Sequence, residues 1–131
     1  MQAHANDLRV EVEKDSAGLV EAGTAGPIPP AGCDAFVHQA VSDWRGCPVS
    51  DKVRVILEYA EKITRVPASC CQNDVHRLRT AGWSDAAIHD AVQVIAYFNY
   101  INRVADALGV ELESGLPMWG HPRANAIDSG I

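Results

Sequence analysis

Four cysteines are the side chains of this sequence best suited to redox chemistry: Cys33, Cys47, Cys70 and Cys71. Cys70 and Cys71 are neighbours, and neighbouring Cα atoms lie about 3.8 Å apart, which is shorter than the roughly 4.4–6.8 Å that a disulfide usually spans. A disulfide between them would be strained. We therefore interpret both as ordinary thiols near a helix start, with a redox role as the alternative. Cys33 and Cys47 flank a short predicted helix, and we expect free thiols there too.

Cysteine and histidine side chains also raise the question of a metal site. Cys71, His76 and His89 offer zinc-ligand chemistry, but their spacing fits no closed four-ligand pattern. A histidine such as His89 on a helix face is more often solvated. The aromatic residues at 97, 98 and 100 are more typical of a core or an interface than of a cofactor site. We predict no metal and no cofactor.

The charge balance narrows the class of partner. The formal net charge is -6, with 47% hydrophobic and 21% charged residues. An acidic chain has no basic surface to neutralise phosphates, so we expect no nucleic-acid partner and no anionic membrane partner. No apolar run approaches the roughly 20 residues that span a bilayer, and the start of the chain does not resemble an export signal. We expect a cytoplasmic protein with reduced thiols.

The elements that position these side chains are all predicted to be helices. Apolar spacing predicts helices over 3–14, 34–44, 51–66, 73–80 and 85–108, with Ser50 and Ser84 as N-caps and Gly82 and Gly109 as stops. A Gly/Pro-rich loop is predicted over 17–34 and an irregular tail over 113–131. No strand pattern occurs. The sequence therefore predicts an all-α fold with one domain over 1–112.

The predicted helices also have predicted inner faces. Leu8 and Val12 form a short stripe on the first helix. The second helix is expected to bury Val37, Val41 and Trp44, and the third to bury a face that includes Val53. The fourth turns Val75 and Leu78 inward. On the long helix the expected buried residues are Ile88, Val92, Ile95, Phe98 and Ala105.

Three blocks of the sequence resemble one known family. They read LEYAEKIT over 57–64, DVHRLRTAG over 74–82 and AYFNYINR over 96–103. Their order and spacing resemble the peroxidase-related branch of the carboxymuconolactone decarboxylase and alkylhydroperoxidase D (AhpD-like) superfamily. The Tyr-Phe-Asn-x-x-Asn-Arg stretch is the most specific part. The resemblance covers most of the chain and implies a compact helical fold that forms homo-oligomers.

The resemblance also implies a site. In this family a Cys-x-x-Cys pair at a helix start reduces hydroperoxides, and a histidine four residues after the second cysteine relays the proton. A helix start favours the thiolate, and the fourth residue returns to the same helix face. His4 falls on the family histidine, and Asn99 and Asn102 fall where relatives line the pocket. On this alignment the second cysteine would stand immediately before Met1, and the family's preceding helices and glutamate are absent.

Three functions follow as hypotheses. The first is an alkylhydroperoxidase-like enzyme with His4 at the remnant site and a small hydroperoxide as substrate. The second is a catalytically inactive, shortened relative that acts as a structural or oligomeric protein. The third is a thiol or metal sensor that uses Cys70, Cys71 and His76. Because helices are missing, the inner faces of the helices of Val53 and Ile88 are expected to be hidden by a partner subunit or left as an apolar patch. Lactone decarboxylation also stays open, since one fold hosts several chemistries.

Overall fold

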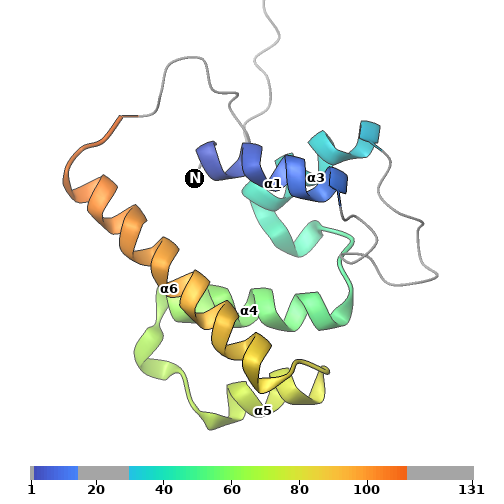
Figure 1. Cartoon of the computed structure of the whole chain (residues 1–131), viewed down its shortest axis with the longest axis vertical. Coiled ribbons are helices and arrows are strands. Elements are labelled where there is room, and N and C mark those ends of the chain that lie inside the picture. Colours follow the sequence, from blue (N-terminus) through green and yellow to red (C-terminus); the bar gives the residue numbers. More distant parts are fainter. Residues whose placement is uncertain (1, 15–29, 112–131) are drawn as a thin grey trace, which may run out of the picture. The chain divides into compact units, whose positions relative to one another are not determined.

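The structure, a computed structural model, describes residues 2–14 and 30–111, although the side chains of a few residues at the starts of the first two helices are outside that description. Every regular element in these residues is a helix, which confirms the all-α prediction (Figure 1). The elements are α1 (Gln2–Lys14), α3 (Pro30–Asp43), the 3₁₀ turn η1 (Trp44–Gly46), α4 (Asp51–Arg65), the 3₁₀ turn η2 (Pro67–Ser69), α5 (Gln72–Thr80) and α6 (Asp85–Ala107).

The chain divides into two compact units. The described part of the first contains α1, α3 and η1, and the second, residues 49–111, contains α4, η2, α5 and α6. The single domain over 1–112 stays a prediction, as does the tail over 113–131, which lies outside the described residues. Within the described ranges, no helix combines the length and the apolar character needed to cross a membrane.

The first unit is a pair of helices joined through small apolar residues. Val12 and Val37 are fully buried, and Ala5 packs with Val37 against the partly buried Leu8 and Val41. The stripe predicted for α1, Leu8 and Val12, therefore faces α3. The carboxylate of Asp34 on α3 accepts a hydrogen bond from Arg9 Nε on α1 at 2.6 Å. This ion pair is exposed, so packing of the small apolar residues supplies most of the contact.

The predicted start of α3 was wrong. The helix begins at Pro30 rather than near Asp34, so the loop predicted over 17–34 ends earlier. Proline lacks an N–H and has a fixed φ, and both are tolerated in the first turn, where the N–H has no helical partner anyway. The helix also ends earlier than predicted, at Asp43 rather than at Trp44, because Asp43 caps η1 and accepts a hydrogen bond from Arg45 N at 3.1 Å.

In the second unit the predicted caps are confirmed. Ser50 accepts a hydrogen bond from the Val53 N–H at 3.3 Å and Ser84 accepts one from the Ala87 N–H at 3.2 Å. Each side-chain oxygen satisfies one of the free N–H groups of a first turn. The stops at Gly82 and Gly109 are confirmed as well, since their φ angles of 90° and 62° are in the region that favours glycine.

The inner faces of α4, α5 and α6 pack against one another. Leu78 and Ile88 are buried, which agrees with the predicted faces, while the apolar residues of α4 are half-buried. Ile88 is thus covered within this unit rather than by a partner subunit. Phe98 was predicted to point inward but is exposed. It lies ten residues after Ile88, which places it about 80° round the helix from that residue.

Candidate functional site

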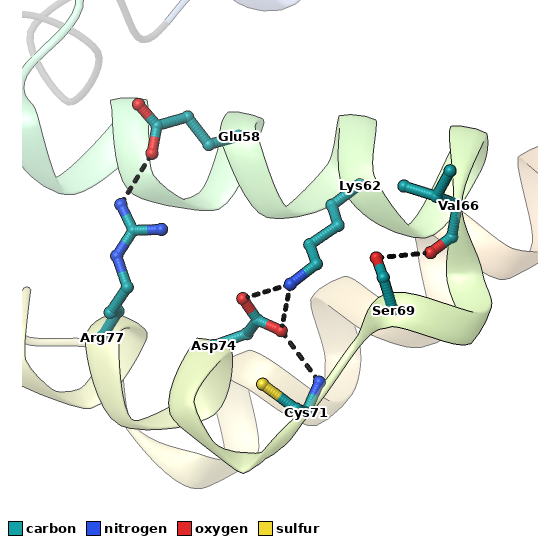
Figure 2. Close-up of polar contacts among 7 residues, drawn as sticks. All are labelled: Glu58, Lys62, Val66, Ser69, Cys71, Asp74 and Arg77. Carbon is teal, nitrogen blue, oxygen red and sulfur yellow. Dashed lines mark hydrogen bonds and ion pairs between the residues drawn. The ribbon is translucent and has the colours of Figure 1, made fainter.

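A group of polar side chains joins α4 to α5. Lys62 Nζ on α4 donates to both oxygens of Asp74 on α5, at 2.8 and 2.7 Å (Figure 2). Asp74 Oδ2 also accepts the backbone N–H of Cys71 at 2.8 Å. Asp74 is only 7% exposed. Three donated hydrogen bonds therefore compensate the burial of its charge.

Local sequence explains why these groups meet. α4 ends at Arg65, Pro67 begins the η2 turn, and the chain reverses to Cys71, which is the N-cap of α5. Asp74 occupies the third position of α5 and reaches back to the N-cap N–H, as in a capping box. The short turn brings this helix start against the side of α4 where Lys62 lies.

The electrostatics of the junction favour charged Lys62 and Asp74. The hydrogen bond to Asp74 raises the pKa of Lys62, and the hydrogen bonds from Lys62 and Cys71 N–H lower the pKa of Asp74. Burial raises the pKa of Tyr59, with further contributions from the charges of Cys70 and Asp74. The Tyr59 phenol therefore stays protonated at neutral pH beside the ion pair.

A small pocket opens at the same junction. Its volume is about 30 Å³, and it is lined by Val55, Glu58, Tyr59, Lys62, Asp74 and Arg77. Arg77 closes one side by donating to Glu58 Oε2 at 2.8 Å (Figure 2). Sites for small organic ligands usually measure about 300–1,000 Å³, whereas one water needs only about 10–15 Å³ of such space. The pocket thus has room for water and not for an organic substrate.

The four cysteines are free thiols in two different settings. Cys33 and Cys47 are buried in the first unit, at 0% and 3% exposure. Cys71 is exposed and Cys70 is half-buried. The backbone is extended through both residues, with φ and ψ of -65° and 138° at Cys70 and -148° and 172° at Cys71. Successive side chains of extended backbone point to opposite sides, which disfavours a disulfide between these neighbours.

The site residues implied by the family resemblance lie elsewhere. The backbone of His4 belongs to α1, but its side chain is outside the described part of the structure. On α6, Asn99 is half-buried and Asn102 is exposed, and neither lines the pocket at the α4–α5 junction. The roles predicted for His4, Asn99 and Asn102 stay predictions.

Arg103 links α6 to the end of α4. Its guanidinium donates to the carbonyl of Asn99 at 3.2 Å and to the carbonyl of Thr64 at 3.5 Å. Thr64 lies in the last turn of α4, where carbonyl groups lack helical partners. Within the most specific sequence block, Arg103 therefore has a structural role in this chain, which is to join α6 to the end of α4.

In residues 2–14 and 30–111, apart from the side chains left undescribed, no group of three or more His, Cys, Asp and Glu side chains is placed to hold a metal ion. Cys71, His76 and His89, the set considered from the sequence, are accordingly not gathered into one.

The ion pairs of the junction were not predicted from the sequence, although the spacing carries a signal. Glu58 and Lys62 are four residues apart on α4, and Asp74 and Arg77 are three apart on α5. Each pair therefore shares one helix face. On each helix the acidic residue comes before the basic residue. Because α4 and α5 run antiparallel, the acidic residue of one helix lies opposite the basic residue of the other. This complementarity would have predicted that α4 and α5 pack together through these residues.

Among known proteins, similarity to this chain is found in solved structures. No model of a protein family matches the chain, and no curated protein matches it. Among solved structures, it is similar to an uncharacterized peroxidase-related protein from Silicibacter sp. TM1040, with 26% sequence identity and a TM-score of 0.68. The match covers 92% of this chain and 53% of that protein, so this chain spans about half the length of its relative. The chain is thus similar in its helical fold to a peroxidase-related protein.

Proposed function

We propose that this chain is a peroxidase-related protein of the AhpD-like superfamily, whose characteristic activity is the reduction of hydroperoxides by thiols. The observation that carries the proposal is the similarity to the peroxidase-related protein over 92% of the chain. The three sequence blocks at 57–64, 74–82 and 96–103 support the same family. They lie on α4, on α5 with the turn after it, and on α6, which are the helices that pack into the second unit.

The chemistry of this activity sets clear demands on the site. A thiolate attacks the O–O bond of the hydroperoxide and becomes a sulfenic acid, while the alkoxide leaves and takes a proton to form an alcohol. A second thiol then condenses with the sulfenic acid to form a disulfide and water. An external dithiol reduces that disulfide to complete the cycle. In the proposed family His4 would donate the proton to the leaving alkoxide.

The thiols of these 131 residues do not meet those demands. Cys33 and Cys47 are buried, so a hydroperoxide does not reach them without opening of the first unit. Cys70 and Cys71 are accessible, but adjacent residues on extended backbone are poorly placed for the resolving step. Neither of them lines the small pocket at the α4–α5 junction. We therefore propose that the chain as given contributes the family's scaffold and has no thiol-peroxidase turnover of its own.

A structural, oligomeric role is the second proposed function. The observation in its favour is the row of exposed apolar side chains on α6, which includes Tyr97, Tyr100 and Leu108. An exposed apolar patch of this extent usually marks a site of contact with another protein. A self-associating scaffold without turnover is consistent with both the fold and the position of the thiols.

The rate of hydroperoxide consumption tests the first proposal. The full chain is mixed with cumene hydroperoxide and dithiothreitol, and the hydroperoxide left is measured over time. We expect the rate of the full chain to equal the rate without protein. The matched variants Cys71→Ser and Cys33→Ser are expected to behave like the parent chain.

Two outcomes would contradict the proposal of a scaffold without turnover. Rapid consumption that Cys71→Ser abolishes and Cys33→Ser preserves would assign the peroxidase activity to the turn at Cys70 and Cys71. Rapid consumption that Cys33→Ser abolishes would place the reactive thiol in the first unit and would mean that this unit opens in solution.

A further inference from the structure

We draw no further inference here: the strongest candidate, the pair of accessible thiols at Cys70 and Cys71 in the turn between η2 and α5, carries none because the extended backbone points the two side chains to opposite sides, so that each is a lone cysteine and nothing in the described residues shows what it would bind.

Discussion

At the scale of single residues, the ion pair between Lys62 and Asp74 is much more enclosed than the pair between Arg79 and Asp85. The side chain of Asp74 is 8% exposed and that of Lys62 is 30% exposed, whereas Arg79 and Asp85 form a pair that is 54% and 72% exposed. Removing one partner of an enclosed pair leaves the other with its desolvation uncompensated, while exposed pairs contribute little. The two pairs therefore provide a test and its control.

We expect Asp74→Asn to lower the midpoint of thermal unfolding clearly and Asp85→Asn to lower it slightly. The pKa of Asp74 is lowered from its ordinary value of 3.8, so its stabilising effect is present above that value and is lost as the pH falls through the lower, folded-state pKa. The pKa of Lys62 is raised above 10.5, so its effect is present below that value and is lost at higher pH. Circular dichroism melts from acid to neutral pH should show a flatter profile for Asp74→Asn. If Asp74→Asn and the parent chain showed the same dependence of the unfolding midpoint on pH, the assignment of this dependence to Asp74 would be contradicted.

Thiol reactivity is the second test at this scale. In the native chain, iodoacetamide should modify Cys71 first and Cys70 more slowly, because one is exposed and the other half-buried. Cys33 and Cys47 should react only after denaturant is added, since both are buried. Peptide mass spectrometry after timed alkylation measures all four in one sample. Native labelling of Cys33 at the rate of Cys71 would be inconsistent with the packing of the first unit.

At the scale of elements, the helix ends marked by a residue with a specific capping role could be predicted. A helix end at a residue that is compatible with more than one structure could not. Ser50, Ser84, Gly82 and Gly109 each provide an oxygen or a backbone conformation that few other residues offer. Pro30, by contrast, is compatible both with a loop and with a helical first turn, so its sequence did not distinguish them. The exposed position of Phe98 was missed because apolarity alone does not say which face of a two-faced helix is inward.

The caps give the prediction at this scale. Ser84→Ala should destabilise the second unit by about 1 kcal/mol, because the Ala87 N–H loses its acceptor. Ser69→Ala is the control, since Ser69 Oγ donates to the carbonyl of Val66 at 2.8 Å, and that carbonyl still accepts the Ser69 N–H at 2.9 Å in the variant. Removal of this hydroxyl should leave the free energy of unfolding nearly unchanged. Urea unfolding followed by circular dichroism gives both values, and equal losses would show that the cap is not the cause.

At the scale of the whole molecule, the helical class followed from the sequence, but the distribution of the elements into two compact units did not. Periodicity reports which side of a helix is apolar and not which other helix covers it. The three sequence blocks that carry the family resemblance, 57–64, 74–82 and 96–103, lie in the second unit and show the same limit. They did not reveal the ion pairs that join α4 to α5. The candidate site was predicted only in part, because Cys70 and Cys71 were identified and Lys62 and Asp74 were not.

The central claim is that the four thiols of this chain include no pair able to complete the proposed family's peroxidase cycle. Intact-protein mass spectrometry tests it most directly, after the reduced full chain reacts with a single equivalent of cumene hydroperoxide without added reductant. We predict that no protein loses two hydrogen atoms, because Cys33 and Cys47 are buried and Cys70 and Cys71 are neighbours on extended backbone. Stoichiometric loss of two hydrogen atoms within one chain, with matching consumption of the hydroperoxide, would contradict the account.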